Sequence, residues 1–176
     1  MRVLVTGGVR SGKSRHAEQL LADRPHVLYV AAGPTTEEEP DPDWAARVAA
    51  HRANRPAGWT TLETRDLVAA VSNAEGPVLV DCLGTWLTGV LDQRGLWNAA
   101  MAEVSVVVDR LLDELVQALL ERTVDVVLVT NEVGLGVVPA HRSGMLFRDL
   151  LGTVNQRVAA CCDEVHLVVA GRVLRL

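Results

Sequence analysis

A glycine-rich segment near the start of the chain has the residue types of a phosphate-binding loop. Residues 7–14 read Gly-Gly-Val-Arg-Ser-Gly-Lys-Ser and match the pattern G-x-x-x-x-G-K-[ST]. Glycines let the backbone N–H groups of such a loop turn inward, and these donors bind a triphosphate together with the positive end of the following helix. Lys13 would reach the β- and γ-phosphates, and the Ser14 hydroxyl would bind Mg²⁺. The predicted nucleotide site contains Gly7, Gly8, Val9, Arg10, Ser11, Gly12, Lys13 and Ser14.

Lys13 is the only lysine among the 17 lysine and arginine residues of the chain. A site that needs a compact ammonium on a flexible stem cannot take the planar guanidinium of arginine. The single lysine therefore stands at the position where a triphosphate-binding loop requires an ammonium group. Because no second lysine exists, the Asn-Lys-x-Asp motif by which switch GTPases read guanine is excluded. A small-molecule kinase or a nucleotidyltransferase remains.

Asp81 follows the apolar run Val78-Leu79-Val80. P-loop proteins place a carboxylate that directs Mg²⁺ at the end of such a buried strand. We therefore expect Asp81 and Ser14 to hold the metal together. The alternative is an aspartate that only caps the following helix.

Arg47, His51 and Arg55 are spaced four residues apart, so they share one face of a helix, with Arg52 beside them. Guanidinium groups around one imidazole could clamp a triphosphate. Nearby positive charge lowers the pKa of a histidine and leaves it neutral and nucleophilic. Spacing alone also fits an exposed arginine-rich helix with an incidental histidine.

Short apolar runs alternate with helical patterns along the chain. We expect strands at Val3–Thr6, Val27–Ala31, Val78–Asp81, Val124–Thr130, Val165–Val169 and Val173–Leu176. We expect helices at Ser14–Asp23, Pro42–Arg55 with Asp41 as N-cap, Arg65–Val71, Leu83–Leu91, Ala99–Glu121 and Ser143–Cys162. The pattern predicts one α/β domain over residues 1–176, a RecA-like P-loop NTPase fold. Its mostly parallel sheet would carry helices on both faces and an antiparallel C-terminal edge hairpin about Gly171.

Composition excludes several classes of protein. A net charge of −5 argues against nucleic acid as the main partner. No apolar run approaches the roughly 18 residues of a membrane span. Three cysteines fit a reducing cytoplasm and not a disulfide scaffold. The acidic, proline-containing segment 33–43 predicts a solvated loop or a lid over a substrate.

Several blocks after the phosphate loop are distinctive. They are His51-Arg52-Ala53-Asn54-Arg55-Pro56 with Trp59-Thr60-Thr61-Leu62-Glu63, then Thr130-Asn131-Glu132-Val133-Gly134 through Pro139, and Phe147–Gln156. With residues 7–15 they resemble, in order and from end to end, the bifunctional adenosylcobinamide kinase / adenosylcobinamide-phosphate guanylyltransferase family of cobalamin assembly. The resemblance implies two reactions. A nucleoside triphosphate, ATP or GTP, phosphorylates adenosylcobinamide, and GMP from GTP then passes through an enzyme histidine to adenosylcobinamide phosphate.

The resemblance also implies roles for individual residues. The guanylylated histidine precedes the arginine of the H-R-x-x-R-P block, which makes it His51, and Lys13 is the other expected catalytic residue. The implied nucleotide contacts beyond the loop are Ala31, Ala32, Gly33, Arg52, Ala53, Asn54, Arg55, Glu63 and Asp81. A carboxylate such as Glu63 can accept from both N1–H and the 2-amino group of guanine. Members of the family are cytoplasmic and tend to be homotrimers.

Some features are left open by the sequence. Gly84, Gly89 and Val173 depart from the residues usual in the family, which puts the corrinoid surface in doubt but not the chemistry. His16 is expected on a helix surface. Arg148, Gly152 and Asn155 form a polar stripe that would bind substrate or another subunit. A kinase without the transferase activity and a nucleotide-sensing module without turnover are the alternative functions.

Overall fold

The computed structural model describes residues 1–53 and 55–176, and it leaves out the side chains of Arg47 and His51. The elements in chain order are β1 (Arg2–Gly7), α1 (Lys13–Leu20), β2 (Leu28–Ala31), α2 (Pro42–Ala53), β3 (Thr60–Glu63), α3 (Leu67–Asn73), β4 (Val78–Asp81), α4 (Leu83–Gln93), a 3₁₀ turn (Leu96–Asn98), α5 (Met101–Glu121), β5 (Val126–Val129), α6 (Arg142–Ala159), β6 (Glu164–Val169) and β7 (Arg172–Arg175). Among the described residues, no helix combines the length and the apolar character that crossing a membrane requires.

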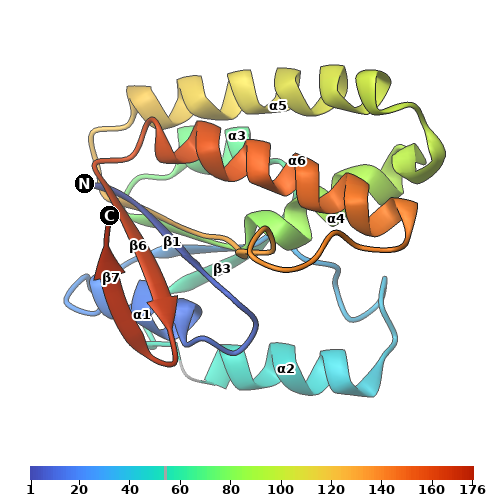
Figure 1. The fold of residues 1–176 in the computed structure, drawn as a ribbon. Coiled ribbons are helices and arrows are strands. Elements are labelled where there is room, and N and C mark those ends of the chain that lie inside the picture. The colour runs from blue at the N-terminus through green and yellow to red at the C-terminus, as the bar shows by residue number, and fades with distance from the viewer. Residues whose placement is uncertain (54) are drawn as a thin grey trace.

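The strands form one sheet in the order β3-β2-β4-β5-β1-β6-β7. Neighbours are parallel throughout, except that β7 runs antiparallel to β6 at one edge (Figure 1). This arrangement confirms the predicted fold class, including the C-terminal hairpin. The carboxyl ends of the parallel strands meet at one edge, which is where ligands bind in sheets of this kind.

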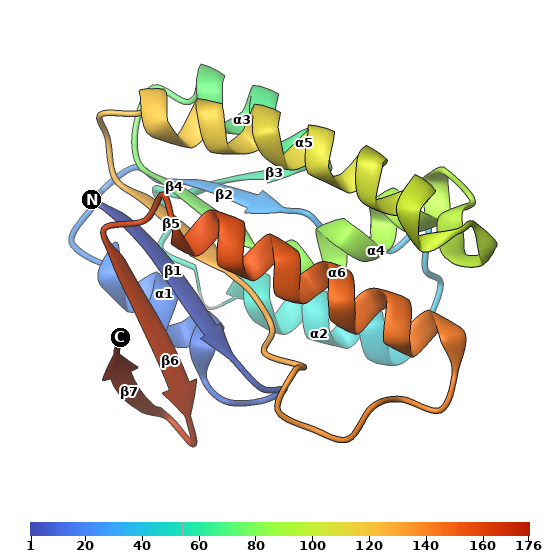
Figure 2. The same cartoon turned by 45° about the horizontal axis from the view of Figure 1, so that its top comes forward.

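Helices cover both faces of the sheet. Figures 1 and 2 show α3, α4, α5 and α6 on one face and α1 on the other. Alternate strand residues serve the two layers, because successive side chains of a strand point to opposite faces. Leu4 and Leu128 pack under α3–α6, whereas Val5 and Val127 pack against α1. Both faces are buried, which explains why the central strands are unbroken apolar runs.

Strand β3 is an element that the sequence analysis did not predict. Its residues Thr60, Thr61, Leu62 and Glu63 are mostly exposed, and the strand pairs only with β2. An edge strand need not be apolar, since one side of it faces water. Because β3 is polar, its sequence does not indicate a strand. The strand nevertheless places Glu63 at the edge formed by the carboxyl ends of the parallel strands.

Helix α2 begins as predicted. The backbone N–H of Asp43 donates to Oδ1 of Asp41 at 2.9 Å, and Pro42 takes the first helical position. The acidic segment before the helix is mostly exposed, and an ion pair at Glu38 helps to hold it. Arg65 donates to both carboxylate oxygens of Glu38, at 2.8 and 2.7 Å.

Candidate active site

The phosphate loop connects β1 to α1. A Cβ at Gly7 would lie 2.5 Å from the backbone oxygen of Val168, so no larger residue fits there. Gly12 has a φ of +94°, a left-handed conformation that favours glycine. The turn between β6 and β7 supports the loop, because the N–H of Gly171 donates to the carbonyl of Ser11 at 2.8 Å. The loop geometry is thus fixed by the neighbouring hairpin.

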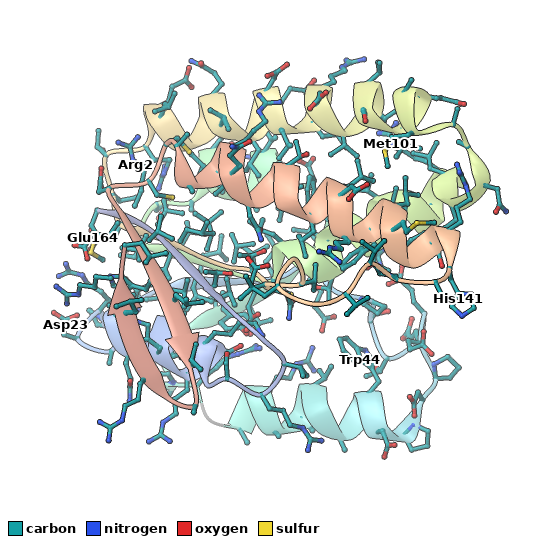
Figure 3. All side chains as sticks on the ribbon, viewed as in Figure 1. Arg2, Asp23, Trp44, Met101, His141 and Glu164 are labelled. Carbon is teal, nitrogen blue, oxygen red and sulfur yellow. The ribbon has the colours of Figure 1, made fainter. Side chains whose placement is uncertain are left out.

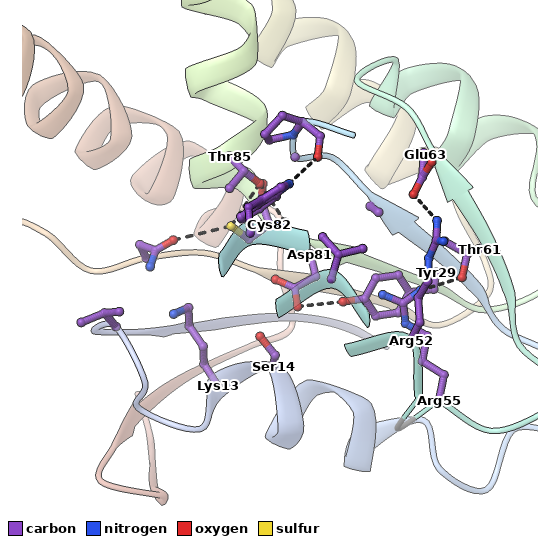
Figure 4. Close-up of a pocket in the computed structure, with 17 residues that line it drawn as sticks. Lys13, Ser14, Tyr29, Arg52, Arg55, Thr61, Glu63, Asp81, Cys82 and Thr85 are labelled. Carbon is purple, nitrogen blue, oxygen red and sulfur yellow. Dashed lines mark hydrogen bonds and ion pairs between the residues drawn. The ribbon is translucent and has the colours of Figure 1, made fainter. Parts of the chain in front are cut away.

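Lys13 occupies the position that its motif predicts. Its side chain is buried, and Nζ donates to the carbonyl of Gly8 at 3.1 Å, which places the ammonium over the loop. Lys13, Ser14 and Asp81 line a single cavity of about 230 Å³ at the carboxyl edge of the sheet (Figure 4). A cation, a hydroxyl and a carboxylate therefore face one space.

Asp81 has a hydrogen-bond partner that the sequence analysis missed. The hydroxyl of Tyr29, from the adjacent strand β2, donates to Oδ2 of Asp81 at 2.9 Å. Burial raises the pKa of Tyr29 strongly, and the negative charge of Asp81 raises it further, so the phenol remains a donor. A lone tyrosine inside the aliphatic run Val27–Ala31 was the available signal, since a buried hydroxyl needs a partner.

The residues present fit a magnesium ion. Mg²⁺ prefers oxygen ligands and is commonly held by one or two protein groups plus the phosphates of a nucleotide. Ser14 offers a hydroxyl, and Asp81 offers the carboxylate oxygen that Tyr29 does not bind. Among the side chains that the structure describes, no cluster of three or more histidine, cysteine, aspartate or glutamate residues could hold a metal ion.

Two arginines reach the other end of the cavity. Arg52 from α2 forms an ion pair with Glu63 at the end of β3. Arg55 donates to Oγ1 of Thr61 at 2.6 Å, and its guanidinium lies 3.5 Å above the ring of Tyr29. The strand that was not predicted therefore supplies the partners of both arginines. A carboxylate beside two guanidinium groups can accept hydrogen bonds from a nucleobase that lies next to a triphosphate.

Helix α2 presents one stripe to this cavity. Trp44, Val48 and Arg52 line it at a spacing of four residues. The indole of Trp44 points from α2 toward the segment after β2 (Figure 3) and donates to the carbonyl of Pro34 at 3.0 Å. Position 51 of the α2 backbone is three residues after Val48, and positions three apart are neighbours on the surface of a helix. The predicted contact at Asn54 lies outside the described residues.

The structure brings most of the predicted nucleotide residues together. The cavity is lined by Val9, Lys13, Ser14, Ala31, Gly33, Arg52, Arg55, Glu63 and Asp81. An adjoining hollow is lined by Arg10, Ser11, Gly12, Lys13 and Ser14, among others. Gly7, Gly8, Ala32 and Ala53 line neither space. The side chain of Ala32 is buried in the core, so only its backbone could face a ligand.

Cys82 and Asn131 also line the cavity, although the sequence did not indicate them as nucleotide contacts. The half-buried Cys82 donates from its thiol to Oδ1 of Asn131 at 3.5 Å, and burial raises the pKa of that thiol. Asn155 donates to the carbonyl of Asn131 at 3.0 Å and accepts from the hydroxyl of Thr130 at 2.6 Å. Asn155, part of the predicted polar stripe, therefore holds the end of β5 within the same chain.

The two unusual glycines of α4 have packing explanations. A Cβ at Gly84 would lie 2.8 Å from Oδ1 of Asn131, and a Cβ at Gly89 would lie 2.2 Å from Nε of Arg65. Both glycines let a polar side chain approach the helix closely. The two glycines that depart from the family pattern therefore make room for the side chains of Asn131 and Arg65.

His16 differs from its prediction as a surface residue. It is half-buried, and its Nε2 lies 2.9 Å from Nδ1 of His166, whose Nε2 contacts Oε2 of Glu164 at 2.8 Å. Burial lowers the pKa of His16, and the nearby His166 and Arg175 lower it further. The prediction failed because β6, distant in sequence, packs beside α1.

A parallel sheet with a phosphate loop after its first strand and a carboxylate at the end of β4 defines a P-loop nucleotide-binding protein. The chain belongs to the cobinamide kinase / cobinamide phosphate guanyltransferase family, whose sequence model matches residues 3–176. It is a bifunctional enzyme of that family, and the comparisons favour this reading over a kinase alone or a sensing module.

Three characterised relatives cover nearly the whole chain. The bifunctional adenosylcobalamin biosynthesis protein CobU of Salmonella typhimurium is 43% identical, in an alignment that covers 97% of this chain and 97% of that protein. The Escherichia coli protein of the same name is 41% identical, and its alignment also covers 97% of each of the two chains. The corresponding protein CobP of Pseudomonas aeruginosa is 38% identical over 97% of this chain and 94% of its own.

Proposed function

We propose that this chain phosphorylates adenosylcobinamide and then transfers GMP from GTP to adenosylcobinamide phosphate, both at the cavity beside the phosphate loop. Family membership supports the two reactions. The observation that carries the location is the meeting of Lys13, Ser14, Asp81 and Glu63 around one space, with Arg52 of α2 at its far end. One nucleotide site would then serve both steps.

The phosphoryl step needs positioning and charge compensation more than a covalent group. The loop N–H groups and Lys13 would hold the triphosphate, and the acceptor hydroxyl would attack the γ-phosphorus while the nucleoside diphosphate leaves. Ser14 and Asp81 would hold Mg²⁺, which supplies charge neutralisation on the phosphates when bound. Lys13 and the metal ligands would thus serve ATP and GTP alike.

The guanylyl step needs a nucleophile, and we assign that role to His51. A neutral ring nitrogen would form a bond to the α-phosphorus of GTP while the bond to pyrophosphate breaks. The phosphate oxygen of adenosylcobinamide phosphate would then attack the same phosphorus and release the histidine. Arg52 and Arg55 would offset negative charge on the transferring group, and Glu63 would accept from the guanine edge. Placement of His51 on α2, directly before Arg52, supports this assignment.

Labelling with α-³²P GTP tests the assignment directly. The wild-type protein should gain one GMP by mass, through a bond that is labile in acid and stable in alkali, as expected of a phosphoramidate. His51→Ala should abolish the label while phosphorylation stays within about tenfold, which is about 1.4 kcal/mol. His26→Ala is the matched control, because His26 is exposed and lies outside the cavity. Label on another histidine would refute the role of His51.

We further propose that the protein acts in the cytoplasm as a homo-oligomer, a trimer by resemblance to its family. The continuous seven-stranded sheet supports one domain over residues 1–176. The three cysteines are free thiols, which fits a reducing compartment. Light scattering after size exclusion would give the mass in solution, and a monomer with full activity would refute the trimer.

A further inference from the structure

We propose that Tyr29 is a positioning residue that fixes the orientation of the Asp81 carboxylate and links it to the arginine segment that follows His51. This inference rests on the proposed function, because it presumes that Asp81 directs Mg²⁺. Tyr29 is the only tyrosine in the chain and is 2% exposed. It would act through Asp81 and Arg55, without touching the reacting atoms.

The first link joins neighbouring strands. In the pairing of β2 with β4, Ala31 lies opposite Asp81 and Tyr29 lies opposite Leu79, two positions earlier. An aromatic side chain is long enough to span such a diagonal pair. The Tyr29 hydroxyl reaches Oδ2 of Asp81 at 2.9 Å (Figure 4). A phenylalanine would fill the same buried space but would leave Oδ2 without this donor.

The consequence concerns the two oxygens of Asp81. With Oδ2 accepting from Tyr29, the carboxylate is held in one orientation, and Oδ1 is left for a ligand in the cavity that Asp81 and Ser14 line. A metal bound through one carboxylate oxygen and one hydroxyl needs that fixed orientation, because Mg²⁺ demands near-octahedral geometry. Loss of the hydroxyl would let the carboxylate turn and bind through either or both oxygens.

The second link joins Tyr29 to the guanylyl-transfer segment. The guanidinium of Arg55 lies 3.5 Å above the Tyr29 ring, and Nη1 of Arg55 donates to Thr61 on β3 at 2.6 Å. Arg55 is four residues after His51 and is the second arginine of the H-R-x-x-R-P block. The cation–π contact therefore holds this part of the block against the same side chain that binds Asp81, and the hydrogen bond ties it to β3. Both reactions would depend on Tyr29 in this way.

Tyr29→Phe separates these roles, because it keeps the ring under Arg55 and removes only the hydroxyl. We expect kcat of phosphorylation and of GMP transfer to fall about tenfold, the scale of one hydrogen bond to a charged group. The Mg²⁺ concentration for half-maximal rate should rise about fivefold for the same reason. Trp97→Phe is the matched control, since it removes an aromatic N–H donor to Asp92 outside the cavity and should change neither value.

Two further measurements distinguish positioning from simple stability. In an Asp81→Asn background, Tyr29→Phe should add little to the loss, because residues that act as a unit are not additive. Protein labelled with [¹³Cζ]tyrosine gives one NMR signal, which should shift when Mg²⁺ and GTP are added to the wild type. An unchanged Mg²⁺ requirement in Tyr29→Phe, or full additivity with Asp81→Asn, would overturn the inference. A wild type that forms neither product would instead refute the proposed function.

Discussion

Replacing Glu63 by glutamine removes a charge and almost no volume, so it tests whether this carboxylate reads guanine. Guanine offers two donors, N1–H and the 2-amino group, to the two oxygens of a carboxylate. Glutamine keeps one oxygen, without charge, and turns its own NH₂ toward the second donor. Losing one charge-assisted hydrogen bond and weakening the other should cost about 3 kcal/mol of transition-state binding. This cost corresponds to a roughly 150-fold decrease in kcat/KM.

The fold should tolerate this change. Glu63 pairs with Arg52, and the two side chains are 37% and 54% exposed, respectively. Such an exposed ion pair contributes at most about 1 kcal/mol to the free energy of unfolding. A drop of roughly 150-fold with GTP would therefore report lost recognition and not lost structure.

The assay compares three nucleotides in single-turnover reactions. GTP should lose about 150-fold in enzyme guanylylation with Glu63→Gln. Phosphorylation by ATP, which lacks both donors, should stay within about threefold, since no hydrogen bond to Glu63 is lost. Inosine triphosphate lacks only the 2-amino group, so the wild type should distinguish it from GTP and Glu63→Gln should not. Glu103→Gln on α5 is the exposed control. Equal losses with GTP and ATP would refute the reading of Glu63 as the guanine acceptor.

Three further predictions concern the phosphate loop, the metal ligand and the histidine pair. Lys13→Arg should lower both activities about 100-fold, because the fork of arginine cannot reproduce a charge-assisted bond from a compact ammonium; near-normal phosphorylation by this variant would contradict the argument. Asp81→Asn should raise the Mg²⁺ needed for turnover, measured by titration, whereas a mere helix cap would lose about 1 kcal/mol of stability with turnover intact. The pKa of His16 is lowered from its ordinary 6.5 in the folded chain, so the unfolded chain binds protons first and stability falls as the pH drops below 6.5. Urea unfolding at pH 7.5 and 5.5 should show a smaller loss for His16→Asn than for the wild type, and equal losses would contradict it.

The elements that could be predicted carry their signal locally. The phosphate loop is a contiguous motif, and Asp41 with Pro42 forms a local start signal for α2. Buried parallel strands such as β4 are apolar runs that end at a turn or a charge, and the predicted bounds Val78–Asp81 match the structure. In each case a short window of sequence contains the physical cause of the structure.

The parts that could not be predicted depend on pairing between distant segments. Tyr29 and Asp81 are 52 residues apart, and their hydrogen bond follows from β2 lying next to β4 in the sheet. His16 and His166 are 150 residues apart and meet because β6 lies beside β1 and α1. Resemblance to the family indicated Glu63, but only the pairing of β3 with β2 explains how it reaches the cavity. A polar edge strand gives no periodic signal from which that pairing could be read.

The burial of the sole lysine has a practical consequence for handling this enzyme. Nζ of Lys13 is the only side-chain primary amine of the sequence. Amine-directed reagents that acylate Nζ would block the triphosphate cradle, and bound GTP should protect the enzyme from that inactivation. A fluorophore or a sensor surface coupled through a lysine side chain should therefore abolish nucleotide binding. Site-specific attachment should instead use chemistry aimed at other side chains.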